Sequence, residues 1–186
     1  MNDPRALLVT VAPTEEVILI SFQMSGFRCF KHYYNFYVKV HMKSEFPRTV
    51  SYNRFVELSQ SVVLPLTIFM KTCCLGTCTG ISFVDSTPIR VCKSKRIRNN
   101  KVFKGVAETG KTTMGWFHGI KLHLVSNDKG EILNFMISAG NMDDRTPLKQ
   151  ESFLREIFGK LFGDKGYISQ QLFETLFSGG LHLVSG

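Results

Sequence analysis

The stretch "ISFVDSTPIRV", residues 81–91, carries one acid, Asp85, at the centre of an apolar run and predicts a buried strand that breaks at Pro88. A carboxylate inside a buried strand needs a partner that compensates its charge. Hydrogen bonds from Ser86, Thr87 or nearby backbone are one kind of compensation, and a metal ion is another. The residues of this stretch leave both interpretations open.

The character of the chain changes near residue 80. Before it, apolar and aromatic residues recur at helical spacing, interrupted by Gly26, Pro47 and Pro65. Ser51 is the predicted start of a helix. After it, two strand patterns flank the turn signal "NDKG", Asn127 to Gly130, and predict an antiparallel hairpin. The expected helices are 14–27, 30–46, 51–70, 143–159 and 169–180, and the expected strands are 81–92, 114–126, 131–140, 160–169 and 181–186.

This order predicts an α/β fold, β-β-β-α-β-α-β, preceded by a helical N-terminal segment. Three antiparallel strands followed by right-handed crossovers form a mixed sheet in which the first strand is central and the fourth lies beside it. Asp85 on the first strand and Asp164 at the end of the fourth would then converge. Oxygen ligands of this kind suit magnesium, and a pair of such ions is suited to phosphodiester chemistry.

Positive charge is concentrated in the middle of the chain. Residues 81–130 hold ten Lys and Arg against three Asp and Glu, and residues 131–186 hold five against seven. A stripe that binds phosphates is one interpretation of this excess, and a solvated loop is the other. Six cations fall within "KSKRIRNNKVFK", namely Lys93, Lys95, Arg96, Arg98, Lys101 and Lys104.

Other residues receive structural interpretations. Asp143 and Asp144 precede a predicted helix, where capping is their expected role. His118, His123 and the single Trp116 are assigned to the sheet or its packing. Zinc is the alternative for "CCLGTC", residues 73–78, but no second pair of ligands accompanies it, and buried free cysteines are the expectation.

The apolar runs are too short to span a bilayer, and the N-terminus lacks the basic start and full apolar core of a signal peptide. The odd number of cysteines also argues against a disulfide framework. We therefore expect a cytoplasmic protein with no membrane partner and no small-molecule substrate.

Six motifs taken in order give the chain a resemblance to a known family. They are "FVDSTPI", "KVFKG", "GWFHGIKLHLV", "NDKGEI", "GNMDDRTPL" and "KLFGDKGYIS", together with "GFRCFKHYY" and "FPRTVSYNRF" upstream. The chain resembles the bacterial insertion-sequence transposases of the DDE superfamily, whose catalytic core is ribonuclease H-like. The resemblance covers most of the chain and divides it into a helical segment, 1–79, and a catalytic core, 80–186, each incomplete.

The resemblance implies that Asp85 and Asp164 are the family's first and second catalytic acids and hold Mg²⁺, or Mn²⁺ in its place. It implies DNA, both element ends and target, as the partner, and it leaves a homo-oligomer open. The family's third acid, a Glu on a helix beyond the fifth strand, has no counterpart here, since Glu174 lies before the last strand. We therefore expect a truncated copy that lacks strand-transfer activity.

Two alternatives remain at this stage. A nucleic-acid-binding fragment without catalysis would keep the basic central segment and lack the third metal ligand. An unstable translation product is the other, because a last strand without its following helix leaves one sheet face uncovered. Metal-dependent cleavage of DNA separates the first alternative from a transposase, and protease resistance argues against the second.

Overall fold

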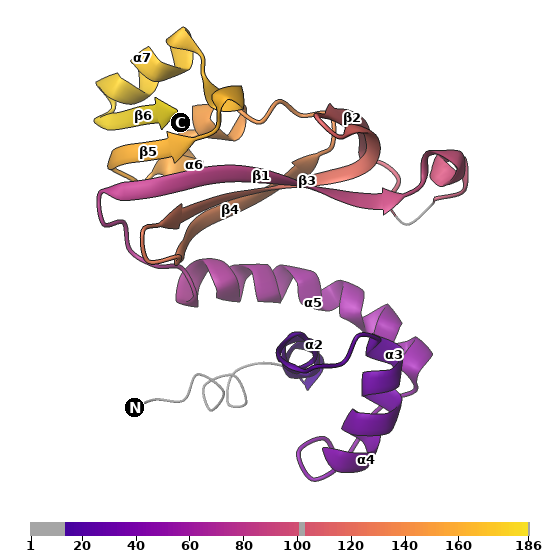
Figure 1. Cartoon of the computed structure of the whole chain (residues 1–186). Coiled ribbons are helices and arrows are strands. Elements are labelled where there is room, and N and C mark those ends of the chain that lie inside the picture. The colour runs from indigo at the N-terminus through magenta and orange to yellow at the C-terminus, as the bar shows by residue number, and fades with distance from the viewer. Residues whose placement is uncertain (1–13, 101–102, 186) are drawn as a thin grey trace. The chain divides into compact units, whose positions relative to one another are not determined.

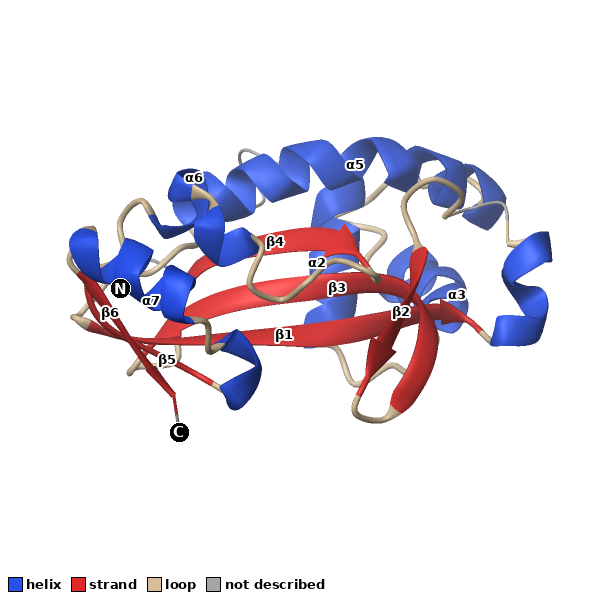
Figure 2. Ribbon diagram, turned by 90° about the horizontal axis from the view of Figure 1, so that it is seen from above, coloured by secondary structure: helices blue, strands red, loops and turns tan. Residues whose placement is uncertain are grey.

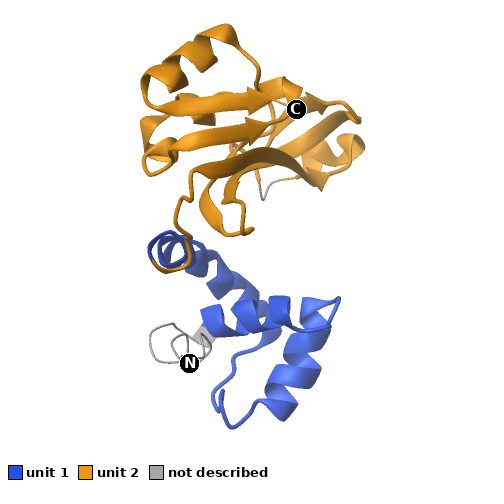
Figure 3. Ribbon diagram, turned by 60° about the vertical axis from the view of Figure 1, so that its left-hand side comes forward, with its two compact units in different colours: residues 1–72 blue, residues 73–186 orange. Residues whose placement is uncertain are grey.

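The structure is a computed structural model that describes residues 14–100 and 103–185. Packing divides the chain into two compact units, unit 1 (Met1–Thr72) and unit 2 (Cys73–Gly186), which Figure 3 colours separately. In the described part of the chain, unit 1 is helical and all strands belong to unit 2. The domain boundary expected between residues 79 and 80 stays a prediction.

Unit 1 is built around aromatic rings. Its helices are α2 (Thr14–Met24), α3 (Phe30–His32), the π-helical turn η1 (Tyr33–Val38), α4 (Lys39–His41) and α5 (Tyr52–Cys73), which runs to the boundary of the unit. The widened π turn is part of this core, since it contributes three of the five buried side chains. The buried core is Ile18, Tyr33, Tyr34, Val38 and Phe55.

Helix α5 begins where the sequence predicts, because the Ser51 hydroxyl accepts a hydrogen bond from the Arg54 backbone N–H at 3.3 Å. The helix continues through Pro65 instead of ending there. Pro65 is exposed, so water can satisfy the backbone carbonyl that loses its helical partner.

Unit 2 contains one mixed sheet. Its strands are β1 (Ile81–Cys92), β2 (Glu108–Thr112), β3 (Gly115–Asn127), β4 (Ile132–Ala139), β5 (Gly159–Gly163) and β6 (Leu181–Ser185). The order is β2-β3-β1-β5-β6, and β4 also pairs with β3. Strands β1, β2, β3 and β4 pair antiparallel, whereas β5 is parallel to both β1 and β6. In Figures 1 and 2, β5 and β6 lie at one end of the long strand β1 and β2 lies at the other.

Short helices connect these strands. They are η2 (Ser94–Asn99), η3 (Pro147–Lys149), α6 (Glu151–Leu154), η4 (Lys165–Tyr167) and α7 (Gln170–Ser178). The core packs side chains of α6, η4 and α7 against those of β1, β3, β5 and β6, as Val84, Val125, Phe153, Leu161, Tyr167, Leu172 and Leu183. The expected mixed α/β sheet is therefore confirmed, and β2 is an additional strand that the sequence did not predict.

Two predicted elements differ in length. Strand β1 does not break at Pro88, which stands opposite Lys121 in the ladder with β3. Beyond Phe83 the other edge of β1 has no pairing with β5, so a residue without an N–H is tolerated there. The single helix expected over 143–159 is instead the two short helices η3 and α6, because Gln150 between them has extended backbone angles, φ −93° and ψ 114°.

Among residues 14–100 and 103–185, none of the helices combines the length and the apolar character needed to cross a membrane.

Candidate functional site

Asp85 and Asp164 occupy equivalent places on neighbouring strands. The parallel pairing of β1 and β5 ends with Phe83 opposite Phe162, whose rings stack at a centroid distance of 5.6 Å. Each aspartate follows its phenylalanine by two residues, so both continue the same register and the same side of the sheet. The ladder ends at this phenylalanine pair and β5 ends at Gly163, so Asp85 and Asp164 lie just beyond the paired residues at the same end of the β1–β5 pair.

Both carboxylates are exposed, and each accepts one local hydrogen bond. The Asp85 Oδ1 atom accepts from the Ser86 N–H at 2.7 Å, and the Asp164 Oδ1 atom accepts from the Gly166 N–H at 2.7 Å, which caps η4. The second oxygen of each carboxylate is available for another partner. The expectation of a fully buried strand is wrong for Asp85, since β1 buries only Ser82 and Val84.

A buried tyrosine lies within electrostatic reach of both aspartates. The Tyr167 side chain is 3% exposed, and within the described structure its hydroxyl makes no regular hydrogen bond. Burial raises the pKa of the Tyr167 phenol, while the nearby Ser86 hydroxyl lowers it. The charges of Asp144, Asp85 and Asp164 raise the same pKa further. Asp85 and Asp164 thus both act electrostatically on one buried hydroxyl.

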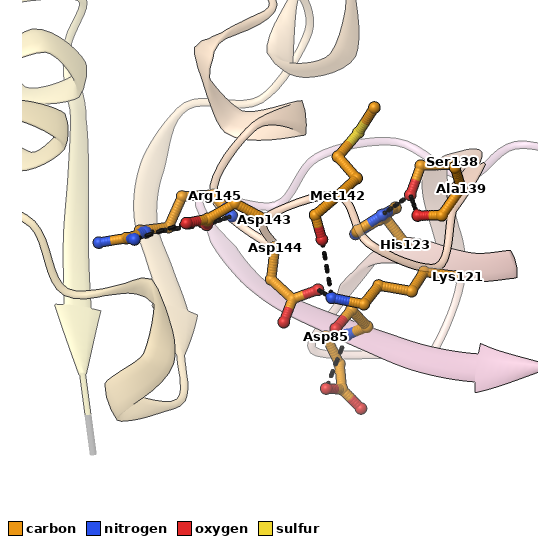
Figure 4. A network of polar contacts seen from close by, with 10 residues as sticks. Asp85, Lys121, His123, Ser138, Ala139, Met142, Asp143, Asp144 and Arg145 are labelled. Atoms are coloured by element: carbon orange, nitrogen blue, oxygen red, sulfur yellow. Dashed lines mark hydrogen bonds and ion pairs between the residues drawn. The ribbon is translucent and has the colours of Figure 1, made fainter. Parts of the chain in front are cut away.

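Asp144 is held by a cation on the sheet. The Lys121 ammonium donates to the Asp144 Oδ1 atom at 2.9 Å and to the Met142 carbonyl at 2.8 Å, and its side chain is 9% exposed. Asp143 instead accepts from the backbone N–H and the guanidinium of Arg145, which lowers the pKa of its carboxyl. Figure 4 shows the two aspartates turned to these different cations. The capping role expected for this pair is wrong, because both acids form ion pairs and the Thr146 cap position makes no side-chain cap.

The side of β3 that carries Lys121 and His123 is its buried side. His123 is 1% exposed, and its Nε2 atom lies 2.7 Å from the Ser138 hydroxyl of β4. The apolar residues that alternate with it, Leu122 and Leu124, are only half-buried. On this buried side Lys121 and His123 thus have polar partners in Asp144 and Ser138, and the apolar Val125 is buried next to them.

The buried imidazole predicts a pH-dependent stability. Burial lowers the pKa of His123 below its ordinary value of 6.5; the Asp144 charge opposes this shift, and the Lys121 charge adds to it. As pH falls below about 6.5, the unfolded chain gains a proton at this histidine that the folded chain does not. The free energy of unfolding is therefore expected to fall between pH 7 and pH 5.5.

Urea unfolding of the chain and of a His123→Gln variant over this pH range measures the effect. Glutamine keeps a group that can hydrogen-bond the Ser138 hydroxyl but does not titrate, so its stability should change less with pH. Parallel curves for the two proteins would show that His123 is not the source of the pH dependence.

The basic stripe lies between β1 and β2, partly on η2. Its described cations are all exposed, and Lys101 lies outside the described residues. The exposed cations are Lys93, Lys95, Arg96, Arg98 and Lys104. Glu174 is exposed on α7 and accepts a hydrogen bond from Gln170 at 3.1 Å, so it belongs to the helix surface.

The candidate metal site consists of two carboxylates, those of Asp85 and Asp164. Within residues 14–100 and 103–185, no three His, Cys, Asp or Glu side chains gather closely enough to hold a metal ion. Magnesium commonly takes only one or two protein carboxylates and keeps several waters, so the exposed pair Asp85 and Asp164 fits it. The all-oxygen character of the pair excludes the sulfur-rich and nitrogen-rich ligation typical of structural zinc.

A family model described as "Transposase DDE domain" matches residues 75–186, which is more than half of the chain. The chain belongs to the DDE transposase domain family. The family acts in DNA transposition, and its domains generally use divalent metal ions. The family part of the predicted resemblance is confirmed, and the matched residues include both candidate acids.

One solved structure similar to this DDE transposase domain is a piggyBac transposase in a synaptic complex with hairpin DNA. The TM-score is 0.53 at 10% sequence identity, and the similarity covers 99% of this chain but 42% of that one. At this identity the comparison supports the fold alone. Among curated proteins, none matches the sequence significantly.

Proposed function

We propose that this chain forms the metal-binding and DNA-binding part of a DDE transposase with a ribonuclease H-like core. Asp85 and Asp164 hold a divalent metal ion, magnesium in the cell, and the exposed cations between Lys93 and Lys104 bind the DNA backbone. In the complete enzyme, this site serves cleavage of a DNA strand at the end of an insertion sequence and transfer of the freed 3′ hydroxyl to target DNA.

The register of β1 and β5 is the observation that carries this proposal. Two acids that are 79 positions apart in the sequence come two residues after the same stacked pair, Phe83 and Phe162. Like charges on neighbouring strands repel each other, and a cation bound between them would remove the repulsion.

Each group of the site has a defined part in this proposal. Asp85 and Asp164 fix the metal through the oxygens that their local hydrogen bonds leave available. A divalent metal bound there would activate water or a 3′ hydroxyl and stabilise the charge on the leaving oxygen. Lys121 neutralises Asp144 and attaches the 140–145 loop to β3, which keeps that carboxylate beside the site without an extra free charge.

The third acid of the family is the missing part of the site. Glu174, the glutamate that follows Asp164 in the sequence, lies on the surface of α7, and no third ligand joins the two aspartates in the described structure. We therefore propose that this chain by itself binds metal and DNA without cutting DNA. Binding to DNA that is indifferent to metal would favour the simpler alternative, a non-catalytic nucleic-acid-binding fragment.

Neutralising the basic stripe is expected to weaken DNA binding and its salt dependence. Each phosphate contact contributes about −0.9 to the slope of log K against log salt concentration, so three lost contacts reduce that slope by about three. The test variant combines Lys95→Gln, Arg96→Gln and Arg98→Gln. Fluorescence anisotropy with a labelled duplex, at several KCl concentrations between about 50 and 200 mM, measures both quantities.

A matched variant controls for the loss of three positive charges. Lys129→Gln, Lys149→Gln and Arg155→Gln remove the same number of exposed cations from other parts of unit 2. This variant should keep the slope of the unmodified chain. Equal changes in both triple variants would show that net charge alone drives binding and would remove the stripe from the proposal.

A further inference from the structure

Trp116 is an exposed aromatic ring without a packing role. It lies near the start of β3, its side chain is 66% exposed, and it is the one tryptophan of the sequence. The expectation that it packs in the sheet is therefore wrong. Tryptophan is highly buried on average, so a ring presented to solvent to this extent indicates a surface that meets a ligand.

A cation accompanies the ring. Lys111 of β2 stands directly opposite Trp116 in the β2–β3 hairpin, and its ammonium lies 5.8 Å from the ring centroid. The hairpin turn tightens at Gly115, whose φ of +107° few other residues adopt. The hairpin thus presents a flat aromatic surface and a positive charge side by side.

The ring lines a cavity that extends to Gly166, whose backbone N–H donates to the Asp164 carboxylate. This cavity, of about 500 Å³, is lined by Trp116 and Lys111 at one side and by Asn141 and Arg145 of the loop after β4. Gly166, two residues after Asp164, also lines it. Its volume is in the range of ordinary ligand pockets. A ligand that occupies the cavity would therefore extend from the aromatic ring toward the acid that is proposed to hold the metal.

The geometry points to Trp116 as a stacking platform for an unpaired nucleobase, with Lys111 binding the adjoining phosphate. This inference rests on the proposed function, since it requires DNA at the neighbouring acids. Aromatic rings beside cations are the usual elements of single-strand binding, because every base presents a flat face and every nucleotide a phosphate. The exposed amide of Asn141 adds a donor and an acceptor for a base edge. The alternative is a protein partner, which would contact the Trp116 ring without needing the Lys111 cation. The experiment tests this alternative.

The single tryptophan makes the test direct. Two DNA probes are compared, a fluorescein-labelled single-stranded oligonucleotide and a dumbbell duplex with closed ends, each followed by label anisotropy and by Trp116 emission. Quenching of Trp116 by the single strand is expected to saturate together with the anisotropy, and the closed duplex should quench it much less. Trp116→Ala is expected to weaken single-strand binding about 10-fold, and Trp116→Phe should retain most of it.

Met114→Ala is the matched control, because Met114 is 86% exposed at the tip of the same hairpin and lies outside the lining of the cavity. This variant should bind like the unmodified chain. Single-strand binding that is unchanged in Trp116→Ala, without quenching, would overturn the stacking site while leaving the proposed DNA binding in place. Equal weakening of both DNA probes would also overturn it, and absence of binding to either probe would overturn the proposed function as well.

Discussion

Asp85→Asn and Asp164→Asn are each expected to weaken Mn²⁺ binding by at least about 100-fold, since even outer-shell partners of metal ligands contribute 10- to 100-fold to affinity. Each substitution removes one negative charge from a site that has two carboxylates to offer. Isothermal titration calorimetry with Mn²⁺, repeated with Mg²⁺, measures the loss. We also expect metal to strengthen binding of duplex DNA by the unmodified chain and not by either variant.

The two substitutions leave the fold unchanged, which makes the test specific. Both side chains are exposed, and asparagine retains the Oδ1 atom that accepts from Ser86 in one case and from Gly166 in the other. The free energy of unfolding should therefore change by no more than about 0.5 kcal/mol. Glu174→Gln removes an exposed carboxylate from α7 and serves as the control. Metal binding that is equally weakened in this control, or unchanged in both aspartate variants, would remove the metal site from the account.

Gly110→Ala is expected to destabilise unit 2 by about 3 kcal/mol, at the upper end of overpacking effects. A methyl group at Gly110 would collide with the Gly140 carbonyl oxygen and lie 2.6 Å from its carbon. Both collisions involve backbone atoms, so no side-chain rotation relieves them. The loop after β4, which carries Asp143 and Asp144, would be pushed off β2, and the cavity beside Trp116 would change shape with it.

Urea unfolding followed by circular dichroism measures this effect. Gly179→Ala is the control in the same unit, because a methyl group there meets only ordinary contacts, the nearest at 3.4 Å from the Leu176 carbonyl oxygen. It lies at the end of α7 with a negative φ of −85°, which alanine adopts without strain. A Gly110→Ala variant as stable as Gly179→Ala would show that the loop does not approach β2 closely in solution.

Local sequence patterns correctly predicted the helices, strands and turns whose formation depends on a few neighbouring residues. The hairpin at Asn127 forms as expected, since its side-chain Oδ1 accepts from the N–H groups of Lys129 and Glu131. Helix α7 and strand β6 also lie where periodicity and the two glycines after the helix indicate. Strand β2 was missed because "ETGKT" is short and polar and is held by its neighbour β3 alone.

The order of the elements predicted that β1 and β5 are neighbours, but it did not predict the surroundings of Asp85 and Asp164. The ion pair of Lys121 with Asp144 joins residues 23 positions apart across a loop, and its position depends on the close approach of Gly110 to Gly140. His123 is buried on the same side of β3 as the apolar Phe117 and Val125, and the Ser138 hydroxyl of β4 is its polar partner there. Contacts of this kind arise from tertiary packing, which strand periodicity does not encode.

A crystal structure of the chain grown with Mn²⁺, with anomalous diffraction recorded at the manganese absorption edge, tests the central claim most directly. The account predicts an anomalous peak between the carboxylates of Asp85 and Asp164, about 2 Å from an oxygen of each, as expected for a small divalent ion. Manganese bound at Asp143 and Asp144 instead, or the two carboxylates turned apart with no peak between them, would contradict it.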